Sequence, residues 1–167
     1  MSARILVAYA SKKGSTAGIA RAVARELESA GMTVDVTPLE SVTSLGAYDA
    51  VVLGTPVYAG KFLADIPAFA SRFSERIARI PVAGFVTGIA PVWPEAGDPD
   101  AITEKFVQAM APGKPVAVTM FAGKFDPREH GILVRSLGKV MKIPAGDFRD
   151  WGSISAWARE LPAKMGF

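Results

Sequence analysis

The sequence predicts an α/β protein in which five parallel strands form a sheet with helices on both faces. Three observations support this fold class. Apolar strand-like runs alternate with amphipathic helical runs along the chain, which favours a parallel sheet with crossover connections. The strand runs are almost wholly apolar, as buried parallel strands are. The chain has 167 residues, shows no linker or repeat, and is long enough for one substantial core, so we predict a single domain over residues 1–167.

Apolar spacing and helix-ending residues define the elements of the first half. The helix after the first strand has Ile19, Val23 and Leu27 on one face, and Gly31 fits its C-cap position. The predicted elements are a strand at 4–10, this helix, a strand at 33–37, a short helix near 41–45 and a strand at 48–54.

The second half continues the alternation with clearer helix starts. Pro99 is acceptable in the first turn of a helix, and Asp150 is a good N-cap residue. The predicted elements are a helix at 64–76, a strand at 81–87, a helix at 99–110, a strand at 115–121 and a helix at 150–165.

Composition excludes several classes of protein. Half of the residues are hydrophobic and 21% are charged, which is typical of a folded chain. No apolar run approaches the roughly 20 residues of a membrane span, and no signal-peptide pattern opens the chain. With no cysteine and with His130 as the single histidine, we predict no metal site. The formal charge of +3 is too mild to indicate nucleic-acid binding, and we expect a cytoplasmic protein.

A small, hydroxyl-rich turn joins the first strand to the helix that follows. Unpaired N–H groups and the helix dipole make a helix N-terminus attractive to anions. The hydroxyl groups add donors, and a glycine lets the backbone approach a ligand closely. The alternative is a plain turn in which Ser15 or Thr16 serves as the N-cap. The turn therefore predicts a phosphate site that consists of Ser11, Lys12, Lys13, Gly14, Ser15 and Thr16.

This turn and two later segments resemble the flavodoxins. Ser11, Gly14 and Thr16 match the Ser/Thr-x-Thr-Gly-x-Thr phosphate loop of that family, with Lys13 in place of the middle threonine. Residues 54–61 and 87–93 follow the third and fourth strands, where flavodoxins place their flavin-ring loops. The resemblance implies a flavodoxin-like sheet in the order 2-1-3-4-5, with FMN at the switch point beside the first strand. It implies ring contacts from Thr55, Pro56, Val57, Tyr58, Ala59, Gly60, Lys61, Thr87, Gly88, Ile89, Ala90 and Trp93.

The end of the chain is similar to one branch of this family. Residues 122–124, a basic segment and residues 146–151 look like the flavodoxin-domain family that includes menaquinone-dependent protoporphyrinogen oxidase. That resemblance implies an FMN-dependent oxidoreductase in which flavin N5 is the reactive centre, and no catalytic side chain is assigned. Two alternatives stay open: a one-electron carrier that serves a redox partner protein, and a flavin-free interaction domain.

Charge near the flavin bears on these alternatives. The resemblance implies acidic surroundings in an electron carrier, whereas residues 55–62 contain no acid and include Lys61. A nearby cation stabilises an anionic reduced flavin, so we hypothesise two-electron chemistry; the alternative is that Lys61 is a solvated surface lysine. Two interpretations stay open for Trp93: it covers the flavin, or it packs within its own loop. Two also stay open for Trp151: it covers a flat ligand, or it anchors the last helix.

The segment 126–143 is amphipathic if it is helical. Leu133, Leu137, Val140 and Met141 then share one face, and Arg135, Lys139 and Lys142 lie opposite. Three interpretations stay open: a helix packed on the domain with its basic face outward, a cover over the flavin, and a contact with a quinone or a membrane surface. The last would make the protein peripheral at a membrane. Whether the redox partner is a small molecule or a protein, and the oligomeric state, are left open.

Overall fold

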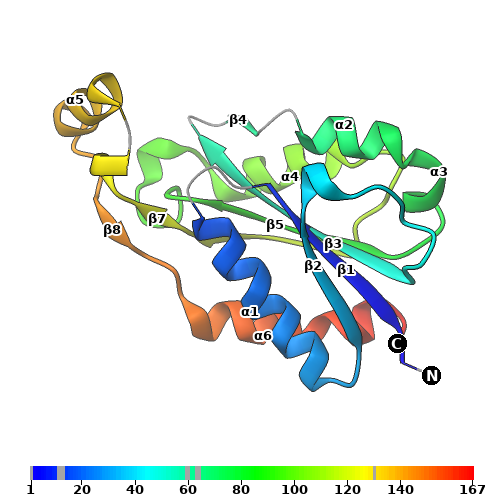
Figure 1. Ribbon diagram of the computed structural model, residues 1–167. Coiled ribbons are helices and arrows are strands. Elements are labelled where there is room, and N and C mark those ends of the chain that lie inside the picture. Colours follow the sequence, from blue (N-terminus) through cyan, green and yellow to red (C-terminus); the bar gives the residue numbers. More distant parts are fainter. Residues whose placement is uncertain (1, 11–13, 59–60, 63–64, 130) are drawn as a thin grey trace.

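Five parallel strands form the main sheet of the computed structural model, in the order β2–β1–β3–β5–β6 (Figure 1). Numbered along the chain, these five strands have the order 2-1-3-4-5, which confirms the predicted fold class. The structure describes residues 2–10, 14–58, 61–62, 65–129 and 131–167. The main strands are β1 (Arg4–Tyr9), β2 (Thr33–Pro38), β3 (Ala50–Tyr58), β5 (Val82–Gly88) and β6 (Ala117–Ala122).

Helices cover both faces of this sheet. Figure 1 shows α1 and α6 on one side and α2, α3 and α4 on the other, while α5 lies away from the sheet. The helices are α1 (Ser15–Ser29), α2 (Asp65–Arg72), α3 (Ser74–Ile77), α4 (Pro99–Ala109), α5 (Ile132–Met141) and α6 (Trp151–Lys164). Short 3-10 turns span Leu39–Ser41, Pro94–Ala96 and Pro127–Glu129.

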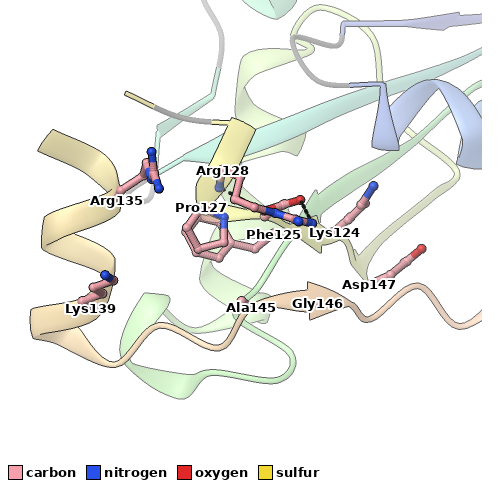
Figure 2. Close-up of a pocket in the computed structure, with 10 residues that line it drawn as sticks. Lys124, Phe125, Pro127, Arg128, Arg135, Lys139, Ala145, Gly146 and Asp147 are labelled. Atoms are coloured by element: carbon pink, nitrogen blue, oxygen red, sulfur yellow. Dashed lines mark hydrogen bonds and ion pairs between the residues drawn. The ribbon is translucent and has the colours of Figure 1, made fainter. Parts of the chain in front are cut away.

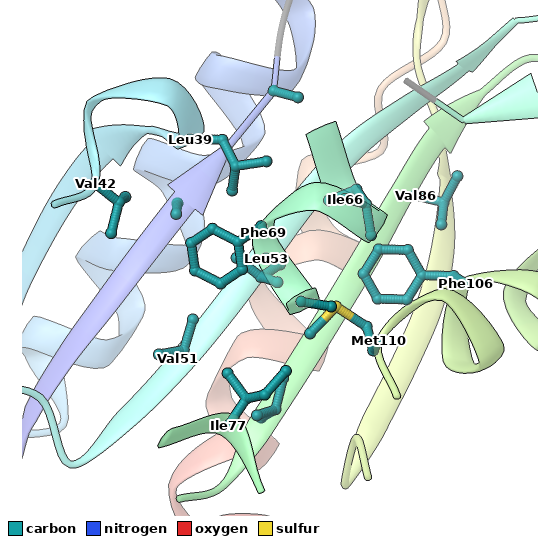
Figure 3. Packing of buried hydrophobic residues seen from close by; sticks show 14 of the residues in the cluster. Leu39, Val42, Val51, Leu53, Ile66, Phe69, Ile77, Val86, Phe106 and Met110 are labelled. Carbon is teal, nitrogen blue, oxygen red and sulfur yellow. The ribbon is translucent and has the colours of Figure 1, made fainter. Parts of the chain in front are cut away.

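Alternate strand residues build a separate core on each face. In β1, Ile5 and Val7 pack with residues of α1 and α6, whereas Leu6 belongs to the opposite core. Successive side chains of a strand point to opposite faces, so a strand covered on both sides is apolar throughout. Figure 3 shows the second core, where Phe69 of α2 and Phe106 of α4 pack over the sheet.

Local sequence signals place three helix ends correctly. Asp150 is the N-cap of α6, and its carboxylate accepts a hydrogen bond from the Ser153 N–H at 3.1 Å. Pro99 occupies the first position of α4, as predicted. Gly31 has a left-handed φ of 92° just after α1, where glycine is favoured.

Three predicted elements differ from the structure by more than two residues or in kind. The predicted helix at 64–76 is two helices, because Phe73 leaves helical geometry (φ −110°, ψ 25°) and packs its ring 4.8 Å from that of Phe69. The predicted short helix at 41–45 is instead the 3-10 turn that ends at Ser41. The third strand does not end at 54 but continues to Tyr58.

A small ribbon carries one segment away from the main fold. In it, β7 (Lys124–Phe125) pairs antiparallel with β8 (Gly146–Asp147). The chain between these strands forms the last 3-10 turn and α5, beyond the ribbon in Figure 1. The predicted helical segment therefore contains one ten-residue helix. Within the described residues, no helix has the length and apolar character needed to cross a membrane.

Candidate functional site

The predicted site lies where β1, β3 and β5 end at one edge of the sheet. The strands run parallel, with Ala8 beside Leu53 and Gly54 beside Phe85. At this edge β1 leads toward α1, and β3 and β5 lead into the two predicted ring segments. The fold therefore brings together three segments that are far apart in the sequence.

The N-terminus of α1 suits an anionic group. Gly14 is the N-cap residue with a left-handed φ of 82°, which glycine adopts without the steric cost of a side chain. The described N-cap makes no side-chain hydrogen bond, and the first turn of α1 has no acidic residue. The positive end of the helix dipole is therefore not neutralised by a carboxylate of its own turn. Ser11, Lys12 and Lys13 of the predicted phosphate turn lie outside the described residues.

Three buried threonines lie beneath this edge, one from each predicted segment. Thr16, Thr55 and Thr87 are each at most 2% exposed. The hydroxyl groups of Thr16 and Thr87 share a hydrogen bond of 2.8 Å, and the Thr55 hydroxyl donates to the Pro56 carbonyl at 3.2 Å. The threonine pair ties the first turn of α1 to the end of β5. Sequence reasoning expected Thr16 to orient a phosphate and did not anticipate this contact.

The first predicted ring segment is a strand extension and not a free loop. Beyond Gly54, β3 stays paired with β5 as far as Pro56 opposite Thr87. Pro56 interrupts no pairing with β1, since that ladder ends at Tyr9 opposite Gly54. The strand then folds back as β4 (Lys61–Phe62), with Tyr58 opposite Lys61. A hydrogen-bonded scaffold therefore positions this part of the site.

Exposure separates the predicted ring contacts into two groups. The first group is buried in the protein, and Ala90 in it belongs to the core beside α2 and α4. The second group keeps accessible surface near the edge. The buried residues are Thr55, Pro56, Thr87 and Ala90; the half-buried residues are Val57, Gly88, Ile89 and Trp93.

The remaining predicted ring contacts are only partly described. Tyr58 and Lys61 are placed by their backbone, and Ala59 and Gly60 lie outside the described residues. Trp93 follows a tight turn in which its N–H donates to the Ile89 carbonyl at 2.7 Å.

Sequence reasoning did not place a charged cluster beside α1, near the predicted phosphate site. Arg149 pairs with Asp147 at 2.6 Å, and its guanidinium lies 4.9 Å from the centre of the Trp151 ring. Its Nη1 lies 2.9 Å from where a Cβ would stand on Gly18, so the guanidinium packs on the first turns of α1. The hydrogen bonds from Arg149 lower the pKa of Asp147 to about 2. Trp151 is 44% exposed, so it does not anchor α6 by burial.

A cavity of about 470 Å³ lies between α5, the 3-10 turn at 127–129 and the β7–β8 ribbon (Figure 2). Arg135 and Lys139 extend from α5 toward this turn and the ribbon. The carboxylate of Asp126 is paired with Arg128 at 3.0 Å, and Asp147 is paired with Arg149. The lining residues are Lys124, Phe125, Asp126, Pro127, Arg128, Arg135, Lys139, Ala145, Gly146 and Asp147. The cavity therefore combines apolar walls with an excess of cations.

Backbone hydrogen bonds connect this cavity to the sheet edge. The Gly123 N–H donates to the Gly88 carbonyl at 2.9 Å, and the Phe148 N–H donates to the Gly123 carbonyl at 3.0 Å. The ribbon therefore starts beside the last residue of β5, and the residue after β8 is bonded back to Gly123, just before β7. The cavity and the predicted flavin site are neighbours in the fold.

The orientation of α5 resolves one of the open interpretations of 126–143. Leu133 and Val140 are 82% and 79% exposed, while Arg135 and Lys139 line the cavity. A helix packed on the domain by its apolar face, with the basic face outward, is therefore wrong for this segment.

Comparison with known proteins supports the relationship that the residues predicted. The chain is 23% identical to protoporphyrinogen IX dehydrogenase (quinone) of Escherichia coli K12, in an alignment that covers 95% of this chain and 94% of that protein. Solved structures share the fold. A flavodoxin from Streptococcus pneumoniae TIGR4 has a TM-score of 0.61 and 18% identity, covering 97% of this chain and 99% of its own.

A second solved structure has the same fold within a longer chain. Rubredoxin oxygen:oxidoreductase from Desulfovibrio gigas has a TM-score of 0.60 and 16% identity, over 98% of this chain and 37% of that protein. The family model described as "flavodoxin domain" matches residues 6–150 of this chain, from β1 to the N-cap of α6. The chain belongs to the flavodoxin domain family.

Proposed function

We propose that this protein is an FMN-dependent oxidoreductase that exchanges two electrons with a small-molecule substrate. The main support for the proposal is the cavity with basic side chains beside the sheet edge. The segment 124–147 forms this cavity. A carrier that serves only a protein partner needs an accessible flavin and no substrate cavity. A cavity next to the flavin site instead suits a substrate that enters and meets the ring.

The described residues fit the phosphate end of FMN. The backbone N–H groups of Gly14, Ser15 and Thr16 stand at a helix N-terminus without an acidic neighbour in its first turn. Val57, Gly88, Ile89 and Trp93 retain surface for the ring. Bound FMN would supply the redox chemistry at N5, and the chain would bind, orient and shield the two reactants.

The Escherichia coli relative supports a two-electron reaction. Its name describes a dehydrogenase of protoporphyrinogen IX that uses a quinone, and the similarity extends over nearly the whole of both chains. We therefore propose a porphyrinogen as candidate donor and a quinone as candidate acceptor for this chain. The basic side chains of the cavity suit a donor that carries carboxylates.

Anaerobic photoreduction of the holoprotein tests this function. The reduced protein is mixed with a quinone, with oxygen or with a low-potential carrier protein, and flavin absorbance is followed. We expect a single two-electron reoxidation that is fastest with the quinone. Slow reaction with the quinone, together with reoxidation in separate one-electron steps by the carrier protein, would support the one-electron carrier instead.

Lys61 gives the electrostatic hypothesis a direct test. Lys61→Glu replaces a cation beside β3 with an anion, which opposes negative charge on the reduced flavin. A unit charge about 5 Å away at an effective dielectric of about 20 is worth roughly 3 kcal/mol, or on the order of 70 mV for two electrons. Spectroelectrochemical titration should show a midpoint lowered by tens of millivolts.

The matched control is Lys114→Glu, an equal charge change on an exposed lysine before the start of β6, at the opposite edge of the sheet. We expect this variant to leave the midpoint nearly unchanged because solvent screens distant charges. Equal shifts in both variants would mean that Lys61 is a solvated surface lysine.

A further inference from the structure

The outer face of α5 is an uncovered apolar surface. Five of the nine exposed large apolar side chains in the described part of the chain belong to this ten-residue helix. Their exposed fractions range from 48% for Met141 to 82% for Leu133. In Figure 1 the helix lies beyond the ribbon and away from both cores. The five residues are Ile132, Leu133, Leu137, Val140 and Met141.

The same segment carries uncompensated positive charge. From residue 131 to residue 146 the sequence contains Arg135, Lys139 and Lys142 and no acidic residue. Neither Arg135 nor Lys139 forms an ion pair with any residue that the structure describes. The carboxylates of Asp126 and Asp147, which line the same cavity, are paired with other arginines. The helix therefore presents an apolar face within a positive field.

We propose that α5 docks this protein on an anionic lipid bilayer, lying in the plane of the interface with its apolar face toward the acyl chains. Ten helical residues extend about 15 Å, which is half the hydrocarbon thickness and suits a helix lying on the surface. The cations lie on the other side of the helix, so the helix width of about 10 Å separates them from the lipid surface. This distance is close to the Debye length of about 8 Å, so the lipid charge still attracts them. The same helix lines the cavity, so docking brings the cavity to the lipid surface.

The charge of α5 favours a bilayer over a second copy of the chain. Two copies would bring the like charges of Arg135, Lys139 and Lys142 together. A lipid surface needs no matching shape and supplies the opposite charge. The proposal does not depend on the identity of the redox substrate.

Vesicle co-sedimentation of the full chain tests the proposal. We use vesicles of phosphatidylcholine alone and vesicles with phosphatidylglycerol added. The wild type should partition at least about tenfold more strongly to the anionic vesicles. Leu133→Ser with Val140→Ser should lower partitioning about tenfold or more on both, because two exposed apolar side chains no longer insert. Arg135→Glu with Lys139→Glu should abolish the preference for anionic vesicles.

Matched controls carry the same changes elsewhere. Val116→Ser alters an exposed valine of the main fold, and Lys105→Glu with Lys114→Glu alters two exposed lysines. These variants should bind vesicles like the wild type, and circular dichroism should show every variant folded. Equal loss in the controls, or no vesicle binding by the wild type, overturns the proposal. So does a concentration-dependent dimer, seen by sedimentation equilibrium, that the Leu133→Ser, Val140→Ser variant loses.

Discussion

The hydrogen bond between Thr16 and Thr87 joins two segments that are 71 residues apart. Both side chains are buried, and a buried hydroxyl is costly unless it has a partner. The type and position of Thr16 in a strand–helix turn predicted a hydroxyl near an anion. Its actual partner could not be predicted, because only the assembled sheet brings the end of β5 to the first turn of α1.

The threonine pair predicts a non-additive effect on stability. Thr16→Val leaves the Thr87 hydroxyl buried without its partner and should lower the free energy of unfolding by about 1–3 kcal/mol. The double variant Thr16→Val, Thr87→Val should lose less than the sum of the two single variants. Urea denaturation of all four proteins measures the coupling. Strict additivity would contradict a specific hydrogen bond.

The ion pair of Asp147 with Arg149 predicts a pH effect on stability. Arg149 lowers the pKa of Asp147 from 3.8 to about 2 in the folded protein, so the contribution is complete above about pH 4 and is lost as the pH falls through 2. Asp147 is 42% exposed, so after screening we expect no more than about 1 kcal/mol.

Asp147→Asn removes this titration while keeping the shape of the side chain. The variant should be slightly less stable than the wild type at pH 6, and the two should converge toward pH 2. Urea denaturation across this range checks the sign. A stability difference that grows as the pH falls would contradict the assignment.

At the scale of elements, capping and proline signals placed three helix ends that the structure confirms. Asp150, Pro99 and Gly31 act through neighbouring backbone groups, so their positions could be predicted from the sequence. The extension of β3 through Pro56 could not be predicted, because proline normally excludes a central strand. It is tolerated here because the pairing with β1 ends before Pro56, and only the assembled sheet shows this.

The arrangement of the segment 124–147, which contains α5, could not be predicted from the sequence either. The two-residue strands of its ribbon are too short for a periodic signal. The amphipathic pattern of α5 predicted two faces, but a pattern does not say which face the rest of the protein covers. In the structure Arg135 and Lys139 line the cavity, and the apolar side chains are exposed.

The start of α1 carries a prediction at this scale. Gly14→Ala places a side chain in the left-handed region, where L-residues pay roughly 1–2 kcal/mol. The added Cβ meets no atom of the described residues within 4 Å, so strain and not a clash with them would weaken the turn. The variant should unfold at lower urea and bind FMN several-fold more weakly.

Two further substitutions control this prediction. Gly14→Asn should recover part of both losses, since asparagine tolerates this conformation better. Gly131→Ala should have little effect, because its φ is not left-handed and the added Cβ meets no atom within 4 Å in the described part of the chain. Normal stability and FMN affinity in Gly14→Ala would contradict the role of this glycine.

At the level of the whole molecule, the order of the strands brings the three predicted flavin-binding segments together. The order β2–β1–β3–β5–β6 sets the ends of β1, β3 and β5 side by side, and Gly123, just before the ribbon, is hydrogen-bonded to Gly88 at the end of β5. Alternation of strands and helices, together with the three turn segments, was enough to predict this edge. The cavity could not be predicted, because it depends on how the segment 124–147 folds back on itself.

We propose that this edge binds FMN through a phosphate at the N-terminus of α1. The most direct measurement is titration of the apoprotein with FMN and, separately, with riboflavin, followed by flavin fluorescence. The purified protein should be yellow and release one FMN per chain, and the apoprotein should bind FMN at least tenfold more tightly than riboflavin, in line with charge-assisted hydrogen bonds worth about 1.5–3 kcal/mol. A protein that binds neither flavin, or binds both equally, would contradict a phosphate site at the start of α1.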